Sequence, residues 1–176
     1  SLWPTLGVGQ AVAPSDGSRL ALVVGNSDYA DSPLRNPGND ARAMRDLLGR
    51  AGFAADLRLD TSRSDLQQAI ARFGQNLRDP RVRFAVFYYA GHGFQLDWRN
   101  HLVPVDARVR NVADVPRQTV DLGDLVRQLS QAQTPARDAG AGRSFLVILD
   151  ACRDDPFAGS YRPPAKGLVP FDAPVG

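Results

Sequence analysis

The chain has 176 residues, of which 43% are hydrophobic and 23% charged, a composition typical of one compact domain with its own core. Disordered, collagen-like and coiled-coil architectures are excluded, and the longest apolar run, Val82 to Ala90, is too short to span a bilayer. The net charge is +2, and arginines are scattered among aspartates, so no basic stripe marks a nucleic-acid surface.

The first half of the chain alternates between strand and helix patterns. Residues 19–24 form a short apolar run that ends in Gly-Asn, which predicts a buried parallel strand. Apolar residues at helical spacing predict a helix over 39–51, with Asn39 as its N-cap. Residues 53–59 predict a second strand, and a second helix follows, capped by Ser62 or Ser64.

The alternation continues in the second half. Residues 82–89 are rich in β-branched and aromatic side chains, which predicts a third strand. A short strand is expected over 102–105, where Pro104 favours a sheet edge. A third helix is predicted over 122–129, and residues 144–149 predict a fourth buried strand. This order implies an α/β fold with a mainly parallel sheet and a site beyond the carboxyl ends of its strands.

The residue types present limit the chemistry. All 19 acidic residues are Asp, so a catalytic carboxylate must be an aspartate. Cys152 is the single cysteine, which excludes an internal disulfide and any multi-cysteine metal site. His92 and His101 are the two histidines, so a zinc site of the usual composition is not expected. The cellular compartment stays undecided.

Two candidate catalytic side chains follow predicted central strands. His92 lies in a glycine-flanked loop after the third strand, and Cys152 follows the fourth. Neighbouring strands lie about 5 Å apart, so an imidazole could take the thiol proton and hold the thiolate as an ion pair. The flanking glycines let a substrate backbone approach and leave the Gly93 N–H free to bind an oxyanion. Taken singly, the cysteine also fits an inert packed residue, and the histidine fits a surface position.

Four sequence blocks resemble, in order and spacing, the caspase-like cysteine peptidases, particularly the bacterial metacaspase relatives called orthocaspases. The blocks are Leu22–Asn26 (LVVGN), Asn39–Ala41 (NDA), Tyr89–Gly93 (YAGHG) and Leu149–Arg153 (LDACR). The resemblance implies a three-layer sandwich in which helices flank a mainly parallel sheet. It also implies that Cys152 attacks the substrate carbonyl, that the N–H groups of Gly93 and Cys152 bind the oxyanion, and that His92 protonates the leaving amine.

The same resemblance implies a substrate preference. Metacaspase-like enzymes carry an Asp at the position of Asp150 and accept Arg or Lys before the scissile bond. Asp40 and Asp150 facing one pocket would repel each other unless a cation lay between them, and a substrate guanidinium could bond both. Asp40 also fits a first-turn helix acid, and Asp150 an acid that caps a turn. The sequence departs from the metacaspase pattern at Ala90, where a Ser is usual, and at Pro37, where a small polar residue or Cys is common.

Domain boundaries are predicted from composition and from the resemblance. We expect an N-terminal extension over 1–18, a catalytic large-subunit domain over 19–155, and a Pro/Gly-rich linker over 156–176, which holds five of the 13 prolines. Relatives continue into a small-subunit portion that completes the sheet, so we expect this chain to pair with that portion, with a second chain or with itself. Arg162 and Lys166 are candidate autoprocessing sites, and both also fit solvated linker charges.

No cofactor is expected, and calcium is the alternative that the resemblance raises. Oxygen ligands for it could come from five aspartates, Asp106, Asp121, Asp124, Asp154 and Asp155. The adjacent acidic pair expected near the third helix is present only as Asp121-Leu122.

The leading hypothesis is therefore a cysteine endopeptidase that cleaves proteins or peptides after Arg or Lys, with no nucleic-acid or membrane partner. A caspase-like interaction or scaffold module without turnover is the alternative. A nucleotide-binding domain at Gly25 has little support, because no phosphate-binding glycine motif occurs. A serine hydrolase is discounted, since Tyr29 stands where a nucleophile elbow needs its second Gly.

Overall fold

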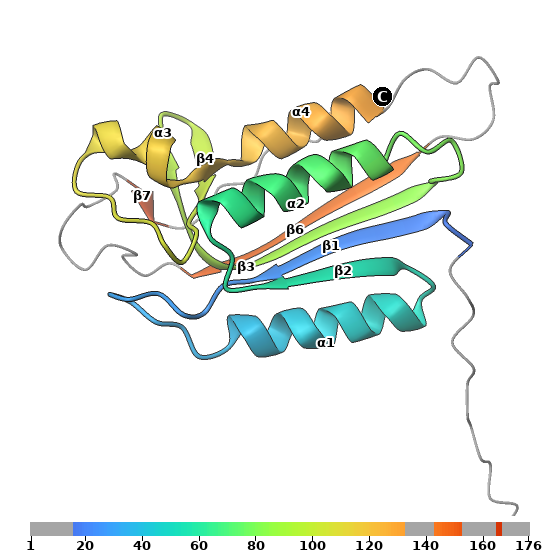
Figure 1. Cartoon of the computed structure of the whole chain (residues 1–176), viewed down its shortest axis with the longest axis horizontal. Coiled ribbons are helices and arrows are strands. Elements are labelled where there is room, and N and C mark those ends of the chain that lie inside the picture. The colour runs from blue at the N-terminus through green and yellow to red at the C-terminus, as the bar shows by residue number, and fades with distance from the viewer. Residues whose placement is uncertain (1–15, 133–142, 153–164, 167–176) are drawn as a thin grey trace, which may run out of the picture.

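The computed structural model describes residues 16–132, 143–152 and 165–166, and its centre is an open sheet (Figure 1). Four strands run parallel in the order β2-β1-β3-β6. Their bounds are β1 (Arg19–Gly25), β2 (Ala54–Leu59), β3 (Phe84–Leu96) and β6 (Ser144–Cys152). The expected mainly parallel sheet is thus confirmed, and its strands all end at one edge.

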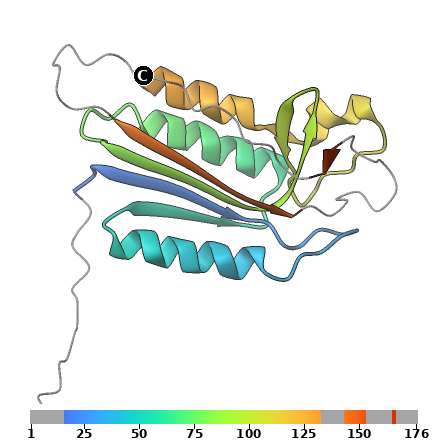
Figure 2. The ribbon, with the colours of Figure 1, turned by 180° about the vertical axis from the view of Figure 1, so that it is seen from behind.

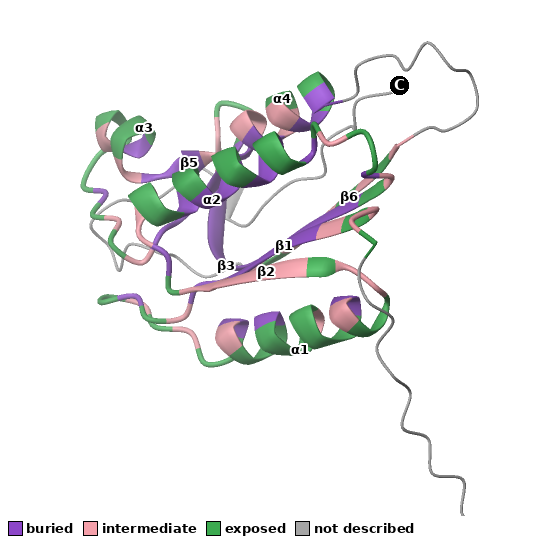
Figure 3. Ribbon diagram, turned by 45° about the vertical axis from the view of Figure 1, so that its right-hand side comes forward, coloured by how far each residue is buried: buried purple, intermediate pink, exposed green. Residues whose placement is uncertain are grey.

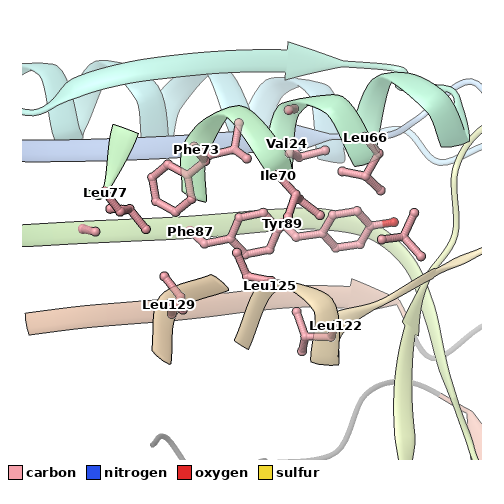
Figure 4. Close-up of a cluster of buried hydrophobic side chains, with 14 of the residues drawn as sticks. Val24, Leu66, Ile70, Phe73, Leu77, Phe87, Tyr89, Leu122, Leu125 and Leu129 are labelled. Atoms are coloured by element: carbon pink, nitrogen blue, oxygen red, sulfur yellow. The ribbon is translucent and has the colours of Figure 1, made fainter. Parts of the chain in front are cut away.

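Helices cover both faces of this sheet and make three layers (Figures 1 and 2). One face packs against α1 (Pro37–Arg50), and the other packs against α2 (Arg63–Asn76) and α4 (Leu122–Ala132). Both helix–sheet interfaces are apolar because α1, α2 and α4 carry their apolar residues at helical spacing. Figure 4 shows the core on the second face, in which α2 and α4 turn Leu66, Ile70, Phe73, Leu122, Leu125 and Leu129 toward the sheet.

The third strand, β3, is the central element of the molecule. Its residues 85–94 are all buried, as expected for a strand covered on both faces, and the run is visible as purple ribbon in Figure 3. Alternate residues serve the two cores: Val86, Tyr88 and Ala90 face α1, whereas Phe87 and Tyr89 face α2 and α4. This alternation determines which β3 side chains share a face with the candidate site.

At the carboxyl edge of the parallel sheet, β3 continues into a small antiparallel sheet. There it pairs with β4 (Arg99–Leu102), and β4 pairs with β5 (Val120–Asp121). A two-residue strand, β7 (Ala165–Lys166), pairs with β3 at Phe94 and Gln95. A 3₁₀ turn, η1 (Val112–Asp114), and the short helix α3 (Val115–Gln118) precede β5.

Several predicted element ends are wrong. The helix expected from Asn39 begins at Pro37 with Asn36 as N-cap, because a proline, which lacks an N–H, suits the first helical position. The strand expected over 102–105 is instead 99–102, since β4 forms a hairpin with the end of β3. The predicted linker contains β7.

The ends of β3 and β6 also differ from the prediction, and these differences concern the site. β3 does not stop at Tyr89 but runs to Leu96, so His92 and Gly93 lie within a strand and not in a loop. The strand extends because its neighbours extend with it: β6 pairs with it as far as Cys152, and β4 pairs with the residues beyond. The candidate histidine and cysteine therefore occupy paired backbone positions on neighbouring strands.

One edge of the parallel sheet is formed by β6. In the residues that the structure describes, β3 is the one strand that pairs with it. Leu146 on this strand is 54% exposed although it is apolar. Within the same described ranges, no helix has the length and apolar character needed to cross a membrane.

Candidate active site

Strand register brings the two candidate catalytic residues together. β3 and β6 are neighbouring parallel strands, and His92 and Cys152 are direct Cα partners across them. Strands paired in this way lie about 4.8 Å apart. Two residues that are 60 positions apart in the sequence are therefore side by side along the backbone.

The imidazole of His92 is fully buried and oriented by a main-chain carbonyl. Its Nε2 lies 2.7 Å from the carbonyl oxygen of Ser32. A carbonyl oxygen only accepts hydrogen bonds, so Nε2 carries the hydrogen and Nδ1 is the basic nitrogen of the neutral ring. Sequence reasoning missed this contact, because any residue type at position 32 supplies the same carbonyl.

Two tyrosines hold the backbone of His92. The hydroxyl of Tyr29 accepts a hydrogen bond from the His92 N–H at 3.0 Å and donates one to the carbonyl of Val103 at 2.9 Å. The hydroxyl of Tyr89 lies 2.7 Å from the carbonyl of His92, to which it can donate. The Tyr29 ring also packs against the imidazole, with centroids 4.4 Å apart. Both phenols are buried, so the N–H and the carbonyl of His92 each have a fixed hydroxyl partner.

Gly91 makes room for these two hydroxyls. A Cβ at this position would lie 2.7 Å from the Tyr29 hydroxyl and 2.8 Å from the Tyr89 hydroxyl, closer than side-chain carbons approach oxygen. Gly91 therefore has a packing role in addition to the expected one in substrate approach. The sequence motif alone did not reveal the packing role, because one of the two hydroxyls belongs to Tyr29, which is far from the motif in the sequence.

The N–H of Gly93 points away from β4. The Val103 N–H donates to the carbonyl of His92 at 3.1 Å, and bonded and non-bonded pairs alternate along an antiparallel ladder. The next pair, Gly93 with Leu102, is then the non-bonded one. The Gly93 N–H is consequently directed toward the side of β3 on which β6 lies.

The two candidate specificity aspartates lie around one tyrosine. Asp40 is in the first turn of α1, Asp150 is near the end of β6, and both are exposed. The hydroxyl of Tyr88, on the α1 face of β3, donates to Oδ2 of Asp150 at 3.3 Å. Burial, the charge of Asp150 with its hydrogen bond, and the charge of Asp40 together raise the pKa of Tyr88 to about 12. Sequence reasoning missed Tyr88, although its position two residues before Ala90 places it on the same face as that residue.

No arginine or lysine within the described part of the chain forms an ion pair with Asp40 or Asp150. Many other aspartates of the molecule are paired with arginine, among them Asp56, Asp79 and Asp121. The two carboxylates near Tyr88 are therefore available to a cation from outside the chain.

The remaining candidate residues are spread over the molecule. Lys166 lies in β7 opposite Phe94, two positions beyond His92 along β3, whereas Arg162 lies outside the described residues. Of the five candidate calcium ligands, Asp154 and Asp155 also fall outside them. The other three have protein partners: Asp106 accepts the N–H of Arg63 at 2.8 Å, Asp121 pairs with Arg99, and Asp124 pairs with Arg127.

Comparisons with known proteins agree with this architecture. The sequence profile of the family described as the caspase domain matches residues 18–169. The human mucosa-associated lymphoid tissue lymphoma translocation protein 1 is 33% identical over 95 residues, which cover 53% of this chain and 11% of that protein. Its mouse homolog is 32% identical over 99 residues, or 56% of this chain and 12% of the homolog. The chain thus spans only about a tenth of the length of these relatives.

Two solved structures share the fold. The Drosophila initiator caspase Dronc superposes with a TM-score of 0.54 at 12% identity, covering 87% of this chain and 54% of that one. A protein from Geobacter sulfurreducens superposes with a TM-score of 0.55 at 17% identity, covering 76% and 50% of the two chains. These similarities concern the fold, because the sequence identities are low.

Proposed function

Because this chain belongs to the caspase domain family, whose fold is that of a cysteine peptidase, we propose that it is the catalytic part of an endopeptidase that uses Cys152 and His92. The observation that carries the proposal is the strand register, in which these two residues are partners on neighbouring strands. The bond from His92 Nε2 to the Ser32 carbonyl supports it further, because it leaves Nδ1 as the base.

The proposed reaction proceeds through an acyl-enzyme. His92 takes the proton of the Cys152 thiol, and the thiolate attacks the scissile carbonyl carbon. The N–H groups of Gly93 and Cys152 stabilise the oxyanion that forms. The C–N bond then breaks, and the imidazolium gives its proton to the leaving amine. A water molecule, deprotonated by His92, hydrolyses the thioester and restores the thiol.

We infer that the residue before the scissile bond is Arg or Lys. Asp40 and Asp150 present two carboxylates that are not paired with a cation within the described residues, and a substrate guanidinium or ammonium would neutralise both. An acidic side chain would be repelled by the same pair. An Asp at position 150 is the residue that the sequence shares with the metacaspase-like pattern.

Mutation of Cys152 to Ala in the full-length protein tests the proposed function. The variant should lose cleavage of a fluorogenic peptide ending in Arg while it keeps the stability of the wild type. Persistence of that activity in C152A would refute the assignment. If neither protein cleaves, a scaffold role is favoured, and a thiol probe carrying an Arg element should then label Cys152 no faster than iodoacetamide does.

The proposal extends to autoprocessing after Arg162 or Lys166. The β7–β3 pairing holds Lys166 opposite Phe94, which is two positions after His92 in β3. This position near the candidate catalytic histidine favours Lys166 as a cleavage site. Intact mass of the purified protein should show a cut after one of these residues, and C152A should stay whole. Identical fragments from both proteins would assign the cut to another protease.

The free edge of β6 supports a partner. Edge strands with unpaired backbone groups readily add another strand, and β6 pairs only with β3 among the described residues. We propose that a small-subunit portion, or a second copy of this chain, supplies the next strand.

A further inference from the structure

Tyr88 lies close to Asp150, which is one of the two aspartates, Asp40 and Asp150, that the proposed function assigns to the substrate cation. Its side chain is 4% exposed and packs in the core between the sheet and α1. Its hydroxyl donates a hydrogen bond to Oδ2 of Asp150 at 3.3 Å. The charge of Asp40 also acts on this hydroxyl, but the hydrogen bond is to Asp150.

We propose that Tyr88 is a positioning residue for specificity, which holds the Asp150 carboxylate in the orientation that accepts a substrate guanidinium or ammonium. This inference rests on the proposed function. Asp150 is exposed, and without a partner its side chain would sample several rotamers, each of which a cation would have to select on binding. A hydrogen bond from a buried phenol fixes one carboxylate oxygen and leaves the other, with its remaining lone pairs, for the substrate.

The environment of Tyr88 suits this role across the working pH range. Burial and the neighbouring carboxylates raise its pKa to about 12, so the hydroxyl keeps its proton and remains a donor near neutral pH. The positions that usually add polarity to a metacaspase-like pocket are Ala90 and Pro37 in this chain. The hydroxyl of Tyr88, which bonds Asp150, would therefore supply polarity that those two positions do not.

The neighbouring tyrosine provides a matched contrast. Tyr89 follows Tyr88 in β3 but faces the opposite core, and its hydroxyl lies against the His92 carbonyl and not against Asp150. Tyr88→Phe and Tyr89→Phe each remove one hydroxyl from the same strand. We expect Tyr88→Phe to raise KM for an Arg peptide about tenfold with little change in kcat, because a hydrogen bond to a charged group is lost. We expect Tyr89→Phe to lower kcat with little change in KM, because it loosens His92.

The kinetic experiment compares an Arg peptide with the same peptide carrying citrulline, a neutral isostere of Arg. Tyr88→Phe should affect KM for Arg but not for citrulline, and should add little once Asp150→Asn is present, because the two residues act as a unit. An equal effect on both peptides, or an additive double variant, would overturn the proposal, since a merely structural role predicts those outcomes. Thermal denaturation of each variant checks that it folds.

A binding experiment separates this inference from the proposed function. Agmatine, which carries the guanidinium of an Arg side chain, is titrated into Cys152→Ala with and without Tyr88→Phe. Weaker binding in the double variant supports the role of Tyr88 even if the wild type cleaves no peptide, in which case only the proteolytic function fails. Equal affinity, or absence of binding to both, overturns the role of Tyr88 whether or not the wild type is active.

Discussion

At the residue scale, the geometry of His92 depends on groups with no motif of their own. The motif Tyr89–Gly93 identifies the histidine, but its ring is oriented by the Ser32 carbonyl and its main chain by Tyr29 and Tyr89. Tyr29 and the Ser32 carbonyl reach His92 because the loop after β1 lies against the end of β3. The tertiary contact with the Ser32 carbonyl therefore determines which ring nitrogen of His92 is basic.

Tyr29→Phe tests the importance of this support. The substitution removes the hydroxyl that accepts the buried His92 N–H and donates to Val103. A buried donor left without an acceptor costs about 1–3 kcal/mol, so the free energy of unfolding in urea should fall by about that amount. The value of kcat should also fall, because the imidazole is less well held. Unchanged stability and unchanged kcat together would show that Tyr29 has no supporting role.

Sequence reasoning predicted the residues of the candidate site but not their support. His92, Cys152 and Asp150 could be predicted from the sequence, because each follows an apolar run that ends at the same sheet edge. The contact from the Ser32 carbonyl could not be predicted, since every residue type has the same main-chain carbonyl. The sequence pattern indicates Tyr88 and Tyr89 only as aromatic residues of a strand. A strand that is buried on both faces shows no alternation of polar and apolar residues, so the pattern does not tell which hydroxyl faces which core.

At the element scale, β3 combines two roles that the sequence suggested were separate. Its first part pairs with β1 and β6 in the parallel sheet, and its last part pairs with β4 in the antiparallel one. The Gly-His-Gly segment indicated a loop because glycine weakens strand propensity. Pairing on both sides overrides that propensity, so the extent of β3 depends on strands that are distant in sequence.

His101 on β4 gives this antiparallel sheet a predictable response to pH. Its ring stacks on Phe94 of β3, with centroids 5.4 Å apart, and is 6% exposed. The Thr119 hydroxyl donates to the Val115 carbonyl, so the His101 Nδ1–H donates to Thr119. Burial lowers the pKa of His101 below its ordinary value of 6.5; the charges of Asp121 and Asp97 raise this pKa to a smaller extent, and the charge of Arg99 lowers it. The neutral ring is therefore the form that the fold accepts.

Because the folded pKa is depressed, the contribution of neutral His101 to stability is fully present above about pH 6.5 and is lost as the pH falls through the folded pKa. His101→Asn keeps a donor for Thr119 and removes the titration. Urea denaturation at pH 7.5 and pH 5 should show a smaller acid-induced loss of stability in the variant than in the wild type. Since His92 is present in both proteins, the difference isolates His101; parallel losses would contradict its assignment as a buried neutral ring.

At the scale of the whole molecule, the parallel sheet has two open edges, β2 and β6, as far as the structure describes the chain. The edge at β6 carries the candidate Cys152 at its end and an exposed Leu146 on its face. The parallel arrangement, the helical layers and this edge were predictable, because alternating strands and helices permit few topologies. The small strand β7 was not, because two residues in a Pro/Gly-rich segment show no periodicity that would predict pairing.

Leu146→Lys tests whether the β6 edge is an association surface. A charge beside an edge strand opposes strand addition, whereas substitution of an exposed residue changes stability by only about 0.5 kcal/mol or less. Leu47→Lys is the matched control, since Leu47 is 53% exposed on α1 and Leu146 is 54% exposed on β6. In sedimentation velocity over a range of concentrations, the wild type and Leu47→Lys should associate while Leu146→Lys stays monomeric. If all three sediment alike, Leu146 does not contribute to self-association, and the partner for β6 must be another polypeptide or bind elsewhere.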